Sequence, residues 1–148
     1  MTAMMQSEEI RIGPIAIRFL IEAGATNGSA AVFEFDVAPG GPTPPPHSHD
    51  GYEETLYGLR GELTWTLEGV ATTVGPGDVL SIPRGVVHRF ENLGDEPATQ
   101  LAIVTPGLLG PDYFREVAAV VDGADGPPDP AEIGAVMMRH GLTPARPV

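Results

Sequence analysis

The sequence predicts an all-β domain, an antiparallel sandwich or barrel, followed by two α-helices. Short runs of alternating apolar and polar residues recur between residues 10 and 105. The 19 glycines and 16 prolines fall between these runs and do not form a low-complexity block. After Gly110 the apolar residues recur at helical spacing instead. Evenly spaced short strands joined by turns are typical of sandwiches and barrels.

The expected strands follow one another closely, and turn residues delimit each of them. They are residues 10–21 (with a turn at Gly13-Pro14), 30–37, 55–59, 62–67, 70–74, 79–82, 86–91 and 98–105. The run of residues 62–67 alternates most cleanly, and Glu68-Gly69 behind it fits a two-residue hairpin turn because glycine accepts a positive φ. The proline-rich residues 39–46 interrupt regular pairing, since proline lacks the backbone donor.

Two helices are expected near the C-terminus. Pro111 suits a first helical position, and apolar residues recur at helical spacing through Val121. After a linker of residues 123–128, residues 129–132 (Asp-Pro-Ala-Glu) resemble a capping box, and the second helix ends before Gly141. The apolar faces of both helices are expected to cover the barrel or a subunit interface. The 148 residues suit one domain, with a tail of residues 1–7, a β-barrel over 8–108 and helices within 111–141.

The composition excludes several chemistries and partners. The formal net charge is −12, which disfavours nucleic acid and anionic membranes because both would be repelled. There is no cysteine, and all eight basic residues are arginine, so thiolate sites and lysine Schiff bases are excluded. No apolar run approaches the roughly 20 residues of a membrane span, and the N-terminus lacks a secretory pattern. We therefore expect a cytoplasmic protein whose partner is a small-molecule substrate.

The stretch from residue 41 to residue 54 carries the candidate metal ligands. His47 and His49 are two residues apart, so in a strand both side chains point to the same face. Glu54 breaks this parity, and Gly51 is expected to let the chain bend and return the carboxylate to that face. His88 would come from a later strand. Three neutral imidazoles and one carboxylate suit a divalent first-row metal, whereas a His-x-His pair alone is weak evidence.

The residues around these four side chains resemble the two sequence motifs of the cupin superfamily. The first motif, G-x5-H-x-H-x3-4-E-x6-G, is met by Gly41, His47, His49, Glu54 and Gly61. The second motif, G-x5-P-x-G-x2-H-x3-N, is met by Gly77, Pro83, Gly85, His88 and Asn92. The resemblance covers about a third of the chain. It implies a cupin-type jelly-roll barrel of six to eight strands with the metal inside its mouth, and a homodimer.

Two adjacent glutamates compete for the role of carboxylate ligand. Either Glu53 or Glu54 fits the permitted gap after His49, but only Glu54 is separated from Gly61 by the six residues that the motif requires. The ligand is therefore assigned to Glu54, and Glu53 is expected to face solvent or an arginine. The sequence leaves the identity of the ion open among Fe, Mn, Ni, Co, Zn and Cu. The affinity order favours copper and zinc at such a site whichever metal the cell supplies, so affinity does not identify the ion.

Other side chains are assigned by strand parity. Phe90 shares the parity of His88, so it is expected to face inward beside the metal. Phe33 and Phe35 are expected to line the same substrate cavity. Leu63, Trp65 and Leu67 share one strand face, and core packing is the favoured reading for Trp65. Tyr52, Tyr57 and Arg84 fit either the barrel mouth or the surface. His140 is expected to interact with the negative end of the last helix dipole and not with metal.

The resemblance does not define one reaction, because one fold hosts many functions. Small cupins with this ligand set resemble quercetin 2,3-dioxygenase-like enzymes, which implies an oxidoreductase acting on a small aromatic or enolic substrate with Glu54 as the base. A metal-dependent isomerase is an alternative within enzymes. Outside enzymes, the resemblance also fits a non-catalytic small-ligand-binding cupin or a cupin whose metal is purely structural. The full ligand set argues against sugar-epimerase cupins, which would use His and Tyr without metal.

Overall fold

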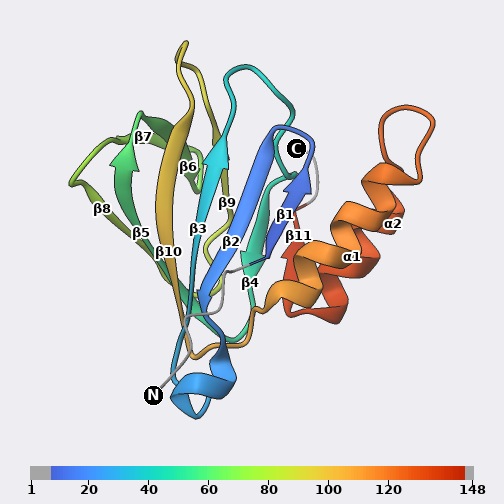
Figure 1. Cartoon of the computed structure of the whole chain (residues 1–148), viewed down its shortest axis with the longest axis horizontal. Helices are drawn as coiled ribbons and strands as arrows, with labels where there is room; N and C mark the ends of the chain where they lie inside the picture. The colour runs from blue at the N-terminus through green and yellow to red at the C-terminus, as the bar shows by residue number, and fades with distance from the viewer. Residues whose placement is uncertain (1–7, 146–148) are drawn as a thin grey trace.

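Two antiparallel β-sheets pack face to face, and two helices lie beside them (Figure 1). The structure is a computed structural model and describes residues 8–145; the tail expected over residues 1–7 lies outside the described residues. The six-stranded sheet has the order β1 (Glu9–Ile12), β2 (Ile15–Ile21), β3 (Ala31–Val37), β10 (Ala98–Thr105), β5 (Glu53–Arg60) and β8 (Val79–Ile82). The five-stranded sheet has the order β11 (Leu142–Pro144), β4 (His47–His49), β9 (His88–Glu91), β6 (Leu63–Leu67) and β7 (Val70–Val74).

This architecture confirms the predicted jelly-roll class and most of the predicted strands. The described residues form more strands than the expected six to eight, because the β1–β2 hairpin and β11 add to the two sheets. Strand β5 begins at Glu53, earlier than expected, and β9 begins only at His88. The hairpin between β6 and β7 turns at Glu68 and Gly69, which both have positive φ (47° and 82°), as the Glu-Gly pair predicts. A short 3-10 helix, η1 (Ala23–Thr26), occupies the predicted turn cluster.

Strand β3 shows how residue alternation divides the two faces of a strand. Phe33 and Phe35 are buried between the sheets. Glu34 and Asp36 point outward, where Arg18 of β2 binds both carboxylates at 2.8 and 2.9 Å. The ion pairs hold polar residues on the outer face while the aromatic residues fill the interior.

Trp65 is part of the core, as predicted. Its indole Nε1 donates to Oε1 of Gln100 at 3.0 Å, and Nε2 of Gln100 donates to the carbonyl of Val74 at 2.9 Å. All three residues are buried, so this chain of bonds satisfies the polar atoms that the core encloses.

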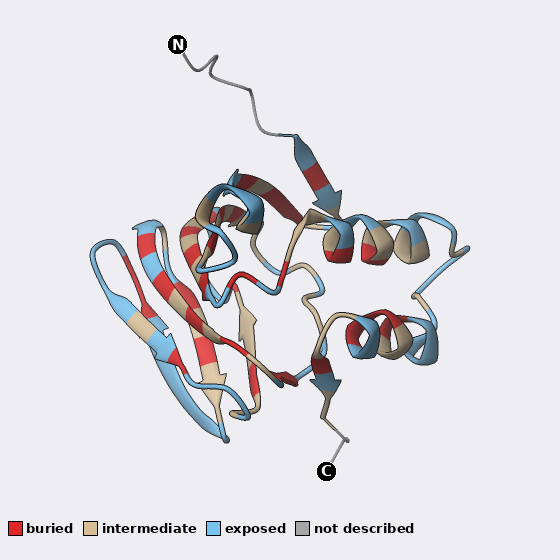
Figure 2. Cartoon of the chain, turned by 90° about the horizontal axis from the view of Figure 1, so that it is seen from below, coloured by how far each residue is buried: buried red, intermediate tan, exposed pale blue. Residues whose placement is uncertain are grey.

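Helices α1 (Pro111–Asp122) and α2 (Pro130–Arg139) match the two helices predicted from the sequence. Asp129 caps α2, because its side chain accepts from the backbone N–H of Ala131. Figure 2 shows buried residues on the sides of the helices that face each other. None of the described helices is long and apolar enough to cross a membrane.

Strand β11 is absent from the sequence prediction, which ended the regular structure at residue 141. Residues 142–144 return to the five-stranded sheet and pair with β4, and Leu142 is buried there. Three residues are too few to show a strand period, so the free edge of β4 decides their conformation. Residues 142–144 are therefore part of the sheet.

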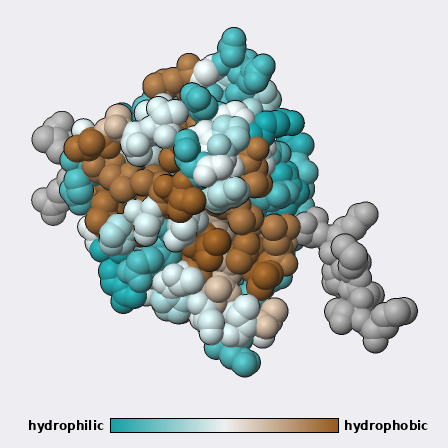
Figure 3. All heavy atoms as spheres, turned by 90° about the vertical axis from the view of Figure 1, so that its left-hand side faces the viewer, coloured by the Kyte–Doolittle hydropathy of each residue, from teal (hydrophilic) through white to brown (hydrophobic). Residues whose placement is uncertain are grey.

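Apolar side chains also reach the molecular surface. Figure 3 shows hydrophobic residues on the face that lies to the left in Figure 1, where β7 and β8 run. Val70 and Val79 on these strands are 71% and 64% exposed. The expected homodimer stays a prediction.

Candidate metal centre

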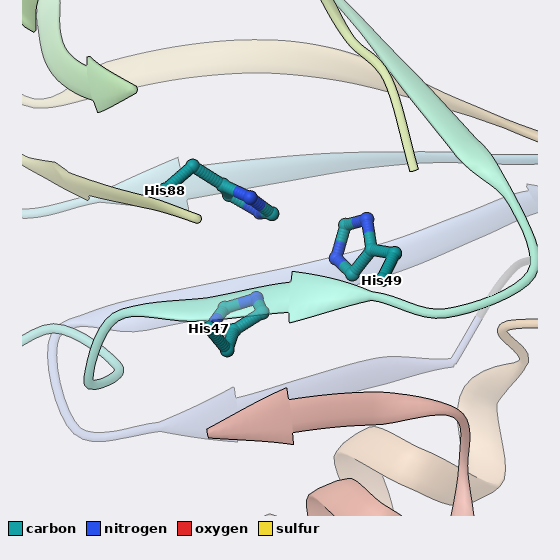
Figure 4. Close-up of side chains that lie close together, drawn as sticks. All are labelled: His47, His49 and His88. Carbon is teal, nitrogen blue, oxygen red and sulfur yellow. The ribbon is translucent and has the colours of Figure 1, made fainter. Parts of the chain in front are cut away.

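Strands β4 and β9 bring three histidine rings together inside the molecule (Figure 4). His47 and His49 lie on the same face of β4, and His88 is the register partner of His47 on β9. All three side chains are buried, and each offers a ring nitrogen within 4.8 Å of the others. The predicted grouping of His47, His49 and His88 is therefore present in the fold.

The protein fixes the ring orientation of two of these histidines. Nδ1 of His47 lies 2.9 Å from the carbonyl of Pro45, and Nδ1 of His88 lies 2.9 Å from the carbonyl of Val86. A ring that donates its Nδ1–H to a carbonyl keeps the lone pair on Nε2, the atom that then faces a metal. Histidine ligands of bound metals are held in this way.

Burial keeps the imidazoles neutral. Burial, together with the charge repulsion of the neighbouring histidines, lowers the pKa of His47 to about 4 and that of His49 to about 2. Burial also lowers the pKa of His88. Neutral imidazole is the form that binds metal, so the site needs no deprotonation of histidine at neutral pH.

His49 and Tyr52 carry polar atoms without a hydrogen-bond partner among the described residues. These atoms are Nδ1 of His49 and the hydroxyl of Tyr52. The two rings stack, with centroids 4.5 Å apart and planes at 21°. An unpaired buried polar atom is costly in the interior of a protein. The three histidines bring imidazole nitrogens within 4.8 Å of one another, and imidazole is a ligand that divalent first-row ions take, so the donor set fits such an ion.

Glu54 reaches the histidines from the opposite sheet. It lies on β5 and is buried, with Oε1 3.9 Å from Nε2 of His88. Two ligands of one ion lie about 3 to 4 Å apart when each bond is about 2.0 to 2.2 Å, so the distance to His88 is compatible with a shared ion. Glu54 does not belong to the group of described residues whose ligand atoms all lie within 4.8 Å of one another, which contains the three histidines, and its role as a ligand stays a prediction. The expectation that Gly51 returns the carboxylate to the face of β4 is wrong, because the chain crosses to the other sheet and faces the histidines from there. Burial raises the pKa of Glu54 to about 7.

Glu53 points away from the site, as predicted. Its carboxylate accepts from Nε and Nη2 of Arg84 at 2.6 and 2.9 Å and from the backbone N–H of Arg84 at 3.1 Å. These bonds lower the pKa of Glu53 to about 2. Arg84 is thus a surface partner of Glu53. Tyr57, which lies on β5 with Glu53, is 40% exposed and also belongs to the surface.

A cavity of about 70 Å³ opens beside the ligands. His47, His49 and Glu54 line it, together with Phe33 and Phe35, which were predicted there. Phe90 is not among the residues that line it. Its ring packs 5.5 Å from Phe35 and 4.9 Å from Trp65 instead, centroid to centroid.

Residues from the C-terminal segment complete the cavity, and the sequence prediction did not name them. They are Leu109, Tyr113, Phe114 and Leu142. The Tyr-Phe pair at the start of α1 was the available signal, since a helix covering the barrel directs its apolar face toward the mouth. Leu142 also pairs with His49 across β4 and β11, which places this segment directly against the ligands.

His140 lies away from the metal ligands, at the C-terminal end of α2. It forms a short hydrogen bond with Glu116 of α1, and Arg139 binds the same carboxylate. The structure therefore gives His140 a link between the two helices, in addition to the predicted position at the helix end.

The buried hydroxyl of Tyr52 leads to a prediction about stability. We expect Tyr52→Phe to leave the free energy of unfolding unchanged or to raise it by about 0.5 kcal/mol, because the change removes a buried hydroxyl that has no partner among the described residues. Chemical denaturation of the two proteins measures the difference. A loss of about 2 kcal/mol or more would show that the hydroxyl is satisfied in solution.

The comparisons with known proteins agree with this site. Residues 33–104 match the Cupin domain family. Quercetin 2,3-dioxygenase of Bacillus subtilis is 31% identical over 84 residues, covering 57% of this chain and 24% of the relative. Germin-like protein 1-1 of Oryza sativa subsp. japonica is 32% identical over 121 residues, covering 78% of this chain and 54% of the relative. The chain thus spans about half or less of the length of these relatives.

A solved structure extends the likeness to the fold. A predicted oxalate decarboxylase from Thermotoga maritima is similar with a TM-score of 0.61 and 25% identity, covering 68% of this chain and 92% of that chain. The family match includes the strands that carry His47, His49, Glu54 and His88. The motifs, the fold, the buried histidines and the relatives all indicate the same family: the chain belongs to the cupin superfamily.

Proposed function

We propose that the chain is a metal-dependent, dioxygenase-like enzyme acting on a small aromatic or enolic substrate. Its metal ligands would be His47, His49, Glu54 and His88. The observation that carries the proposal is that three of these four residues line a cavity with aromatic walls. A purely structural metal would be enclosed by its ligands, whereas an enzyme needs space beside them for a substrate.

The donor set determines which chemistry is available. When bound, a divalent ion such as iron, manganese, nickel or cobalt supplies a Lewis acid that polarises a substrate oxygen. The histidines hold their positions through the carbonyls of Pro45 and Val86. Glu54 would accept the proton of an enol, because it is a carboxylate on the cavity wall and an ionised carboxylate beside the substrate can act as a general base.

The cavity wall favours a neutral substrate. Among the described residues that line the cavity, none is an arginine, and Glu54 is the only carboxylate. A dicarboxylate or a sugar phosphate would lose its hydration there and gain no cationic side chain. An enol or an aromatic hydroxyl loses less hydration, and Phe33 and Phe35 offer it an apolar wall.

The test combines metal analysis with oxygen uptake. We expect about one equivalent of a divalent metal in the purified or reconstituted protein, and oxygen consumption that depends on a flavonol or a 1,3-diketone. Bound metal without oxygen consumption would contradict the dioxygenase assignment and shift the proposal to an isomerase or a ligand-binding cupin. A protein that takes up no metal even after reconstitution would contradict the metal centre itself.

A further inference from the structure

We propose that a second cavity, beneath the C-terminal helices, binds the phenyl-sized apolar end of the substrate whose oxygen atoms reach the metal centre. This inference rests on the proposed function and adds the shape of its substrate. The cavity measures about 160 Å³. It is separate from the ligand set and lies largely outside the stretch that matches the family, since α1 and α2 form one of its walls.

The helix cavity, as we name this space, lies between four segments of the chain. The turn between β1 and β2 contributes residues 12–15, and the proline-rich segment contributes residues 42–45. Helices α1 and α2 supply Val117, Val121 and Met137 on the opposite side. Residues far apart in sequence thus surround one space.

The helix cavity adjoins the metal-site cavity. Five residues line both spaces: Ile15, Ile17, Pro44, Tyr113 and Phe114. Because the two spaces share these walls, the inference is that one ligand extends from the histidines, past Tyr113 and Phe114, to the space between the helices. The shared walls favour a second part of the same molecule over an unrelated ligand as the occupant.

The wall of the helix cavity indicates the chemistry of the portion of the substrate that would occupy it. Of the described residues that line it, none is charged, and Thr43 and Tyr113 are the only ones with polar side chains. A partly open apolar space of this kind favours an uncharged hydrocarbon group. An apolar cavity of about 150 Å³ in another protein holds one benzene molecule, so 160 Å³ suits a single phenyl ring.

The two cavities together describe an aryl-substituted enol or diketone. The metal-site cavity, at about 70 Å³, has room for a small polar head and not for a second ring. Tyr113 lines both spaces, so it lies at the boundary between the head and the ring. A substrate with a phenyl group on one side of a 1,3-dicarbonyl unit matches both volumes.

The experiment compares two probes that share the same head. Calorimetry measures the affinity of 2,4-pentanedione and of 1-phenyl-1,3-butanedione for the metal-free protein and for the Zn²⁺-loaded protein. We expect the phenyl compound to bind at least about tenfold more tightly in both forms, because burying a ring of this size in an apolar site strengthens binding by about that factor or more. Equal affinities in the wild-type protein would overturn the inference.

A matched pair of variants locates the ring. Val121 lines the helix cavity, whereas the neighbouring Val120 lines neither cavity. Val121→Phe fills the space and should abolish the phenyl preference, and Val120→Phe should retain it; thermal unfolding verifies that both variants fold. Loss of the preference in Val120→Phe, or its full retention in a folded Val121→Phe, would contradict the assignment.

The outcomes separate this inference from the proposed function. Binding is measured without turnover, so a phenyl preference without oxygen uptake supports the helix cavity and contradicts only the dioxygenase assignment. Oxygen uptake with 2,4-pentanedione and no phenyl preference would overturn only the helix cavity.

Discussion

Replacing His88 with alanine is expected to lower the affinity for a divalent ion by about a hundredfold or more. His88 offers one of three buried ring nitrogens that lie within 4.8 Å of each other, and its Nδ1 is already bound to the carbonyl of Val86. Loss of a residue that merely supports a ligand lowers metal affinity by about 10 to 100-fold, so loss of the ligand should cost at least as much. The alanine side chain offers no donor atom in its place.

Equilibrium titration with Zn²⁺ or Co²⁺ and elemental analysis measure this loss. His140→Ala is the control, because it removes a histidine of the same chain that binds Glu116 and lies outside the buried group. We expect the control to bind metal like the wild-type protein. Unchanged metal affinity in a folded His88→Ala variant would show that β9 does not contribute a ligand.

Residue parity explains why so much of the fold and site was predictable. His47 and His49 share a face because they are two residues apart, and the alternation around Phe33 and Phe35 gave the inward face of β3. The choice of Glu54 over Glu53 came from the motif spacing to Gly61, and the alternating burial of β5 agrees with it. Local periodicity specifies the direction of a side chain whenever a strand is buried on one face.

Long-range pairing explains what the sequence could not provide. Leu142 joins the sheet only because β4 presents a free edge, and the carboxylate of Glu54 approaches from the second sheet because the chain crosses over before it. The helix cavity depends on residues from four separated segments, and their spacing along the chain has no period. Each of these features follows from packing and not from local propensity.

Replacing Glu54 with glutamine is the second change with a large expected effect. The metal affinity should fall about tenfold or more, because the neutral amide oxygen lacks the charge that attracts a divalent ion. The side-chain shape is kept, so the cavity and the barrel should remain intact. Glu54 is buried 3.9 Å from Nε2 of His88, where few other groups could replace its oxygen.

Glu53→Gln is a closely matched control for this change, since the same substitution is made one residue earlier on β5. Glu53 faces outward and binds Arg84, so its variant should lose an exposed ion pair worth at most about 1 kcal/mol and keep the wild-type metal affinity. Zn²⁺ titration of the two variants and the wild-type protein compares them directly. If Glu53→Gln weakened metal binding and Glu54→Gln did not, the carboxylate ligand would be the outward residue, and the assignment from the motif spacing to Gly61 would be wrong. If both variants bound metal normally, the centre would consist of the three histidines alone, and Glu54 would be a buried carboxyl close to the ion and not one of its ligands.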